Sequence, residues 1–199
     1  MRTATINFKD LFVETQLEDT RPSLKTERLL LRPFGLEDED AVFRICSEKE
    51  IAANTRSIPY PYPREQAVHW IKQHSELWST GKSAIFAICD LETEDLIGAV
   101  GLEINQGDQN AELGYWIDKE KWGRGYCTEA AAEVLRFGFE TLSLHRIHAH
   151  HITTNPASGR VLEKIGLKPE GVHRGHVRKW GQFYDVSCFG LLYCDYQQH

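Results

Sequence analysis

Apolar positions along the chain follow two spacings, which predict strands and helices in turn. Apolar runs typical of strands lie at 27–34, 83–89, 96–104, 111–118, 145–152, 171–178 and 183–193. Apolar stripes at helical spacing lie at 37–48, 64–79, 125–142 and 156–165. The order is strand, two helices, three strands, helix, strand, helix and two strands. It predicts one α/β (α+β) domain without an internal repeat.

Two segments have well-marked boundaries. The strands at 83–89 and 96–104 carry apolar residues at both parities and are joined by an acidic connection at 90–95, so we expect a hairpin that is buried on both faces. The helix at 156–165 has Asn155 as its N-cap, Pro156 at its first position and Gly166 just after its end.

Two other segments lack a regular pattern of apolar positions. Residues 1–22 mix Thr, Asp and Glu with few apolar positions, and we expect a peripheral N-terminal arm there and a single domain over 23–199. The segment 54–63 contains three prolines together with Tyr60 and Tyr62. It predicts a loop that carries aromatic side chains.

Charge and composition exclude several classes of protein. The 23 Lys and Arg against 29 Asp and Glu give a net charge of −6, so no overall field attracts nucleic acid or an anionic membrane. The N-terminal residues lack the apolar core of a secretory signal, and we find no stretch long enough to span a membrane. Five scattered cysteines without a CxxC pair indicate reduced thiols. We therefore expect a cytoplasmic protein, monomer or homodimer, without nucleic acid or membrane partners.

The segment KWGRGYCTEA, residues 121–130, joins a predicted strand to a predicted helix. Gly123 and Gly125 flank Arg124, so the backbone can turn tightly and present its N–H groups at the start of the helix. Such a turn can bind a pyrophosphate. The alternative is a turn that only joins the strand to the helix. Thr128 stands where a dinucleotide-binding fingerprint needs a third Gly or Ala, and no GxxxxGK[ST] loop occurs in the chain.

Three motifs in order, AELGYWID (111–118), WGRGYCTEA (122–130) and NPASGRVLEKIGL (155–167), resemble those of the GNAT N-acetyltransferases. The opening LKTERLLLRPF and the closing YDVSCFGLLYCDY are similar to the RimJ/RimL-like branch, which acetylates ribosomal-protein N-termini. The resemblance covers about residues 24 to 196. It implies the GNAT acyl-CoA N-acyltransferase fold: a mixed, mostly antiparallel sheet flanked by helices and splayed between the strands at 111–118 and 145–152.

The resemblance also implies acetyl-CoA as co-substrate. The backbone of Trp116 and Ile117 would bond the pantetheine arm, with Asn155 on its other side. The family often has Gln or Arg where this chain has Trp122 and Gly or Ala where it has Cys127; backbone contacts tolerate both changes if Cys127 faces the helix core. The residues implied at the pyrophosphate are Gly123, Arg124, Gly125, Tyr126, Cys127 and Thr128.

Acetyl transfer to an amine needs a base for the amine and a proton for the leaving thiolate. Glu112 is the candidate base, since strand alternation places it on the face of Gly114 and Trp116; the alternative is a structural carboxylate paired with another residue. Ser158 resembles the hydroxyl that the RimL type places beside the sulfur. The alternative for Ser158 is a solvated serine in the first turn of a helix.

The histidines at 145–151 could suggest a metal site. On a strand His148 and His150 share one face and His145 and His151 the other. Four ligands therefore do not converge, and no second acid or cysteine set completes a site. We predict no metal.

The sequence leaves three functions open. The first is an acetyl-CoA-dependent Nα-acetyltransferase whose amine acceptor is a protein or peptide N-terminus. The second is an acetyltransferase for a small amine such as an amino acid, a polyamine or an antibiotic. The third is a non-catalytic acyl-CoA-binding regulatory module. Tyr60, Tyr62 and Trp180 lie in loops that border the acceptor in the family, or act there as packing lids.

Overall fold

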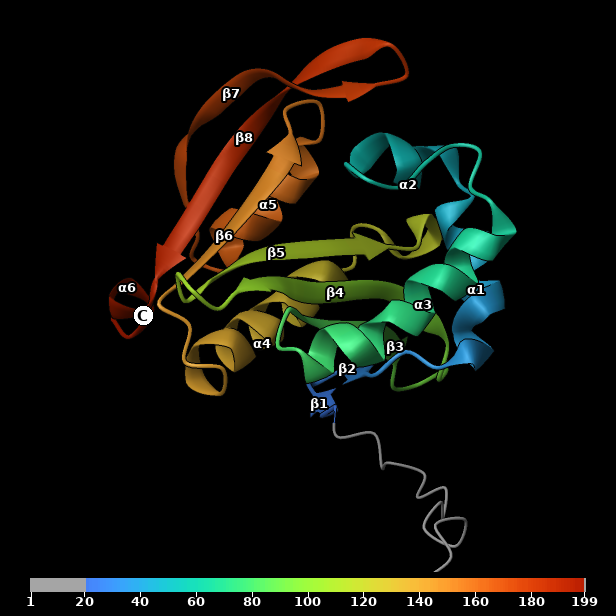
Figure 1. Ribbon diagram of the computed structural model, residues 1–199, viewed down its shortest axis with the longest axis horizontal. Helices are drawn as coiled ribbons and strands as arrows, with labels where there is room; N and C mark the ends of the chain where they lie inside the picture. The colour runs from blue at the N-terminus through green and yellow to red at the C-terminus, as the bar shows by residue number, and fades with distance from the viewer. Residues whose placement is uncertain (1–20, 199) are drawn as a thin grey trace, which may run out of the picture.

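One eight-stranded sheet runs through the computed structural model, which describes residues 21–198 (Figure 1). The strand order is β1-β2-β3-β4-β5-β6-β8-β7. Every neighbouring pair is antiparallel except β5 and β6, which are parallel. The strands are β1 (Leu24–Lys25), β2 (Leu29–Arg32), β3 (Ser83–Asp90), β4 (Leu96–Asn105), β5 (Asn110–Ile117), β6 (Arg146–Ile152), β7 (Lys168–Lys179) and β8 (Gln182–Leu192). The predicted mixed, mostly antiparallel sheet is confirmed.

Helices cover both faces of this sheet and enclose two hydrophobic clusters. One cluster lies under α1, α2 and α3, and the other under α4 and α5. The helices are α1 (Glu39–Cys46), α2 (Lys49–Asn54), α3 (Arg64–Ser79), α4 (Tyr126–Glu140), α5 (Pro156–Lys164) and the terminal α6 (Tyr193–Tyr196), with short 3-10 turns at Leu36–Asp38 and Lys119–Lys121.

Strand β3 shows why apolar residues occur at both parities. Phe86 and Ile88 belong to the cluster under α4, whereas Ala87 and Cys89 belong to the cluster under α1 and α3. The acidic connection closes a hairpin, with the N–H of Asp90 donating to the carbonyl of Asp95 at 3.0 Å. The prediction of a hairpin buried on both faces is confirmed.

Some boundaries differ from the prediction. The predicted helix at 37–48 is observed as a 3-10 turn followed by α1, which ends at Cys46. Glu48 adopts an extended backbone (φ −69°, ψ 128°), and the additional helix α2 begins after it. The last two strands begin earlier than predicted, β7 at Lys168 and β8 at Gln182. Their register shifts between Pro169 and Gly171 and again between His173 and Val177. Residues 1–20 of the predicted arm lie outside the described residues, so the division between arm and domain stays a prediction. Within 21–198, none of the helices has both the length and the apolar character needed to cross a membrane.

His74 is a buried titratable group in the middle of α3. Its side chain is 3% exposed, and neither ring nitrogen has a hydrogen-bond partner in the described part of the chain. It packs against Trp70 and Phe34 at ring-centroid distances of 4.4 and 5.4 Å. Burial lowers the pKa of His74 from 6.5 to about 4, so the folded chain holds a neutral imidazole.

We expect this histidine to make stability rise with pH. Between about pH 4 and 6.5 the His74 imidazole is protonated in the unfolded chain but stays neutral in the folded chain. The His74 contribution to the free energy of unfolding should therefore fall by about 3 kcal/mol as pH drops through that window. Denaturant unfolding at several pH values should show a flatter dependence for His74→Leu, whereas His69→Ala, an exposed position on the same helix, should keep the wild-type slope. Equal slopes in wild type and His74→Leu would contradict the assignment.

Candidate active site

The parallel pairing of β5 with β6 stops half-way along the strands. Only residues 110–112 of β5 pair with 146–148 of β6, and the last pair is Glu112 with His148. Beyond that point β5 continues beside β4 to Ile117, and β6 continues beside β8 to Ile152. The two strands therefore diverge, as Figure 1 shows. The predicted splay is confirmed. From 113 to 117, the edge of β5 that faces β6 has no partner strand within the described chain.

The diverging strand β5 leads to the glycine turn that begins α4, residues 123–128, called here the phosphate loop. Gly123 and Gly125 have φ values of 75° and 82°, a region that favours glycine. Gly125 is the N-cap of α4 and supplies no side chain that bonds the first-turn N–H groups. These N–H groups and the positive end of the helix dipole face the exposed loop, which suits an anion.

An ion pair from the start of the chain holds this loop. Arg28 bonds the Glu129 carboxylate through Nε at 2.7 Å and the carbonyl of Arg124 through a second nitrogen at 3.0 Å. Thr26 also donates to Glu129, at 2.6 Å. Burial opposes ionisation of Glu129, but these hydrogen bonds outweigh it and lower the pKa of its carboxyl. The acid in the first turn of α4 is thus neutralised by Arg28.

The structure accommodates Cys127 and Trp122, the two residues that differ from the family motif. Cys127 packs against the cluster under α4, and burial raises the pKa of its thiol to about 12. A thiol with such a pKa is protonated near neutrality and is a weak nucleophile. Trp122 donates its indole N–H to the carbonyl of Ile117 at 2.7 Å. One of the two residues expected to bond pantetheine therefore already has its carbonyl engaged.

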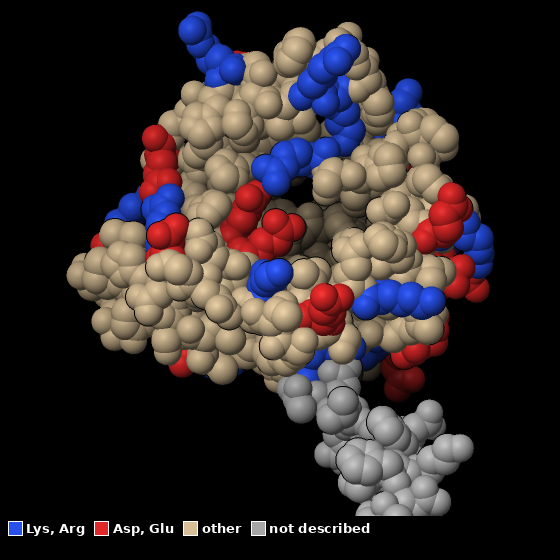
Figure 2. Space-filling view, in the orientation of Figure 1, with Lys and Arg blue, Asp and Glu red and all other residues tan. Residues whose placement is uncertain are grey.

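A cavity of about 340 Å³ opens beside the diverging part of β5. Its walls come from the α1–α3 side of the sheet, from the loop at 54–59, from β6 and from the start of α5. Figure 2 shows the hollow on this face of the molecule, with acidic side chains along its edge. Trp70 and Trp116 lie together in the wall, with ring centroids 6.2 Å apart.

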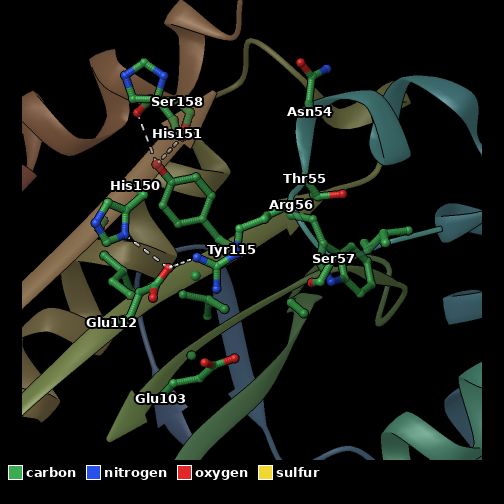
Figure 3. Close-up of a pocket in the computed structure, with 18 of the residues that line it drawn as sticks. Asn54, Thr55, Arg56, Ser57, Glu103, Glu112, Tyr115, His150, His151 and Ser158 are labelled. Atoms are coloured by element: carbon green, nitrogen blue, oxygen red, sulfur yellow. Dashed lines mark hydrogen bonds and ion pairs between the residues drawn. The ribbon is translucent and has the colours of Figure 1, made fainter. Parts of the chain in front are cut away.

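Glu112 lies at this cavity, at the last paired position of β5 (Figure 3). Its side chain is half-buried, and its carboxylate oxygen lies 3.8 Å from the Arg56 guanidinium and 3.3 Å from Nδ1 of His150. Trp116 packs with the cluster on the α1–α3 side, and Leu113 with the opposite one. The carboxylate is thus accessible from the cavity, as a base must be, and it is also paired with neighbouring side chains, as a structural carboxylate would be. The geometry is compatible with both interpretations made from the sequence.

Ser158 lies on the other side of β5, in the first turn of α5. The Asn155 side chain accepts a bond from the N–H of Ser158 at 3.3 Å, and the predicted N-cap is confirmed. The Tyr115 hydroxyl lies 2.9 Å from the Ser158 hydroxyl and 3.1 Å from its carbonyl oxygen. Burial raises the pKa of Tyr115, which keeps the phenol protonated. Ser158 is therefore a half-buried, hydrogen-bonded serine rather than a solvated one.

Three residues of the site have no assigned role in the sequence analysis: Arg56, Tyr115 and His150. Arg56 belongs to the loop noted only for its tyrosines, and Tyr115 faces away from Glu112 along β5. The start of α5 returns to that opposite face and meets the phenol, as Figure 3 shows. The signal available in the sequence was the phenol within the motif AELGYWID.

The histidines of β6 follow the predicted alternation. His148 and His150 are neighbours, with ring centroids 5.3 Å apart, and His151 instead contacts Phe189. The argument against a metal site required four converging ligands or a completing acid or cysteine set, whereas three groups meet here, because Glu112 on the adjacent strand lies beside this pair. Burial lowers the pKa of His148, although the nearby Glu112 charge partly offsets it.

The two loops expected at the acceptor side contact each other. The Tyr60 and Trp180 rings meet edge to face at 6.2 Å. The buried Lys179 ammonium contacts the carbonyls of Thr55 and Ile58, and burial lowers its pKa. The β7–β8 hairpin therefore fastens the loop that carries Arg56 over the cavity.

Comparison with known proteins agrees with this geometry. The family model described as an acetyltransferase (GNAT) domain matches residues 28–168. The chain belongs to the GNAT acetyltransferases. Among curated relatives, the uncharacterized N-acetyltransferase YoaA of Bacillus subtilis is 33% identical over 177 residues, which cover 86% of this chain and 97% of YoaA.

Two solved structures show the same GNAT fold. The ribosomal L7/L12 alpha-N-protein acetyltransferase RimL, in complex with coenzyme A, matches with a TM-score of 0.79 at 16% identity, over 86% of this chain and 98% of that one. The spermidine N-acetyltransferase of Vibrio cholerae, in complex with CoA and spermine, matches with a TM-score of 0.75 at 24% identity, over 86% and 99% of the two chains. At these identities the likeness concerns the fold, and the acceptors of the two proteins differ.

Proposed function

We propose that this GNAT protein transfers the acetyl group of acetyl-CoA to the α-amino group of a protein or peptide N-terminus. The position of Glu112 is the observation that carries the proposal. Its carboxylate lies at the point where β5 and β6 separate, and it faces the cavity. The separated strands offer room and unpaired backbone for the pantetheine arm, and the phosphate loop lies at the end of the same strand. A thioester in that gap lies next to an acceptor in the cavity.

The proposed roles divide between the two sides of β5. The acceptor nitrogen attacks the thioester carbonyl carbon, so that an N–C bond forms and the C–S bond breaks. Glu112 takes the proton from the amine, directly or through a water molecule. A backbone N–H of Trp116 or Ile117 polarises the carbonyl. Ser158 passes a proton to the leaving thiolate while its own oxygen regains a proton from water.

The choice of an N-terminus follows from base strength. An α-amino group has a pKa of about 8, so roughly a tenth is uncharged near neutrality, whereas a lysine with a pKa of about 10.4 is almost wholly charged. A carboxylate is a weak base, so it is better suited to deprotonate an α-amino group than a lysine side chain. The likeness to RimL supports the same choice, since that protein is described as an alpha-N-protein acetyltransferase.

One observation favours a second acceptor class, a small polyamine. Glu103 on β4 lies directly opposite Glu112 in the β4–β5 register, and both line the cavity. Like charges opposite each other on a sheet are unfavourable, and a cationic amine between them relieves the repulsion. The spermidine acetyltransferase of Vibrio cholerae has the same fold.

A thiol-release assay with acetyl-CoA and a panel of acceptors tests the proposal. The panel contains peptides with a free N-terminus, the same peptides with a blocked N-terminus and a free lysine, and spermidine. We expect turnover with the free N-termini only. Turnover confined to spermidine would support the second class, and CoA binding without turnover on any amine would support a regulatory module.

Replacing Ser158 with Ala is expected to lower kcat by about 10- to 100-fold with little change in CoA affinity. The effect is modest because a thiolate, whose conjugate thiol has a pKa of about 8.5, is a fair leaving group without an acid. Tyr115→Phe is the matched variant: it removes the hydrogen-bond partner of Ser158 but keeps the serine hydroxyl, so its loss should be smaller. Steady-state kinetics and calorimetry with CoA measure the two quantities. A wild-type rate for Ser158→Ala would assign thiolate protonation to water, and a loss confined to affinity would make Ser158 a binding residue.

A further inference from the structure

The parallel pairing of β5 and β6 brings three potential metal ligands together. Glu112 on β5 is in register with His148 on β6, and His150 follows two positions later on the same face. One ligand atom from each residue lies within 4.8 Å of the others. All three side chains are half-buried, so the group is open to an ion from solvent yet held by the sheet.

The distances suit a small transition-metal ion. Such an ion binds imidazole nitrogen and carboxylate oxygen at about 2.0–2.2 Å, which places neighbouring ligand atoms roughly 3 to 3.5 Å apart. The Glu112 oxygen and Nδ1 of His150 are already 3.3 Å apart. The third ligand atom, on His148, lies within 4.8 Å of the other two, so a bound ion would draw it closer.

His150 contributes the atom of the cluster whose bonding is least satisfied. Its Nδ1 atom is buried and makes no hydrogen bond within the described residues, although the Glu112 carboxylate lies 3.3 Å away. A buried polar atom without a hydrogen bond is unfavourable, and an ion bound to it removes the penalty. The Arg56 guanidinium lies 3.8 Å from Glu112, and its side chain is 54% exposed, so a cation bound to Glu112 would displace it toward solvent.

We propose that Glu112, His148 and His150 form a binding site for a divalent transition-metal ion of the Zn²⁺ type, and that the bound ion inhibits the enzyme. Two imidazoles and one carboxylate select zinc, cobalt or nickel over magnesium and calcium, which prefer oxygen ligands. A carboxylate that holds the ion has no free lone pair directed at the acceptor amine. The inhibitory part rests on the proposed function of Glu112, whereas the binding part does not.

Binding is tested on the full-length, untagged chain after treatment with a chelator. Titration with Co²⁺, followed by its visible absorption, and calorimetry with Zn²⁺ should show one ion per chain. His148→Ala and His150→Ala should each weaken binding by about tenfold or more. His69→Ala, which removes an exposed histidine of α3, should bind as wild type does. Mg²⁺ at the same concentration should give no heat.

Two results would overturn the site. One is the absence of saturable binding in the wild type. The other is unchanged binding in the His148→Ala/His150→Ala double variant, with loss in His176→Ala, which would place the ion on the β7–β8 hairpin. That hairpin carries His173 and His176, with ring centroids 5.0 Å apart.

Inhibition is tested separately, with the acetylated product counted by mass spectrometry because free Zn²⁺ also binds the released thiol. We expect Zn²⁺ to suppress acetylation and EDTA to restore it. The ratio of rates with and without Zn²⁺ should approach one in His150→Ala, and an unchanged ratio there would refute inhibition through this site. A chain that binds Zn²⁺ but acetylates no amine would refute the proposed function and leave the metal site standing.

Discussion

Glu112→Gln is expected to lower kcat by about 10²- to 10⁴-fold near neutral pH, the range typical of a lost general base. The amide has the shape of the carboxylate but cannot accept the proton of the amine. Binding of acetyl-CoA should stay within a few-fold of wild type, because the phosphate loop and the separated strand edge lie elsewhere on β5 and α4. Steady-state kinetics and CoA calorimetry measure the two quantities.

The pH profile separates this role from a structural one. As pH rises towards about 8, the pKa of an α-amino group, the acceptor loses its proton without help, so the deficit of Glu112→Gln should shrink. Glu163→Gln, an exposed carboxylate on α5, is the control and should follow the wild-type profile. A wild-type rate for Glu112→Gln would assign the carboxylate to its pairing with Arg56 and His150.

Gly125→Asp is expected to weaken CoA binding by about a thousandfold. The substitution places a carboxylate at the N-cap of α4, beside the N–H groups that would bond the pyrophosphate. At about 6 Å and an effective dielectric constant of about 20, each phosphate charge is repelled by about 3 kcal/mol. The loss is measured by calorimetry, or as a missing thermal shift on adding CoA.

Gly125→Asn separates charge from backbone strain. Asn has nearly the same size as Asp, carries no charge and tolerates a φ of 82° better than most residues. We expect it to retain most of the affinity. If Asn and Asp were equally harmful, the loss would come from backbone geometry; if both bound CoA as wild type does, the phosphate loop would be misassigned.

Local signals made much of the fold predictable. Helix α5 was predicted at 156–165 and is observed at Pro156–Lys164, because Asn155, Pro156 and Gly166 mark its ends within the sequence. Helix α2 was missed, since its six residues bury only Ile51 and Ala52, too few to show helical spacing. The break at Glu48 is a backbone conformation that no neighbouring residue type demands.

The site was predictable only in part, because its contacts cross the fold. Strand alternation placed Glu112 on the correct face, but its partner Arg56 comes from a loop 56 positions earlier and His150 from a different strand. Tyr115 meets Ser158 over a separation of 43 residues. These contacts depend on where β6 and α5 pack against β5 in the folded chain. The spacing of residues along the sequence does not give that position.

The contact between Arg28 and Glu129 bears on how the chain tolerates shortening. A version starting at residue 29 would retain β2 and every later strand, so its sheet would remain nearly complete. It would nevertheless lack both Thr26 and Arg28, the groups that bond the Glu129 carboxylate. An unopposed negative charge would then stand in the first turn of α4, where we propose that the pyrophosphate of CoA binds. We expect such a shortened protein to fold but to bind CoA poorly, although the deleted residues lie about a hundred positions before the phosphate loop in the sequence.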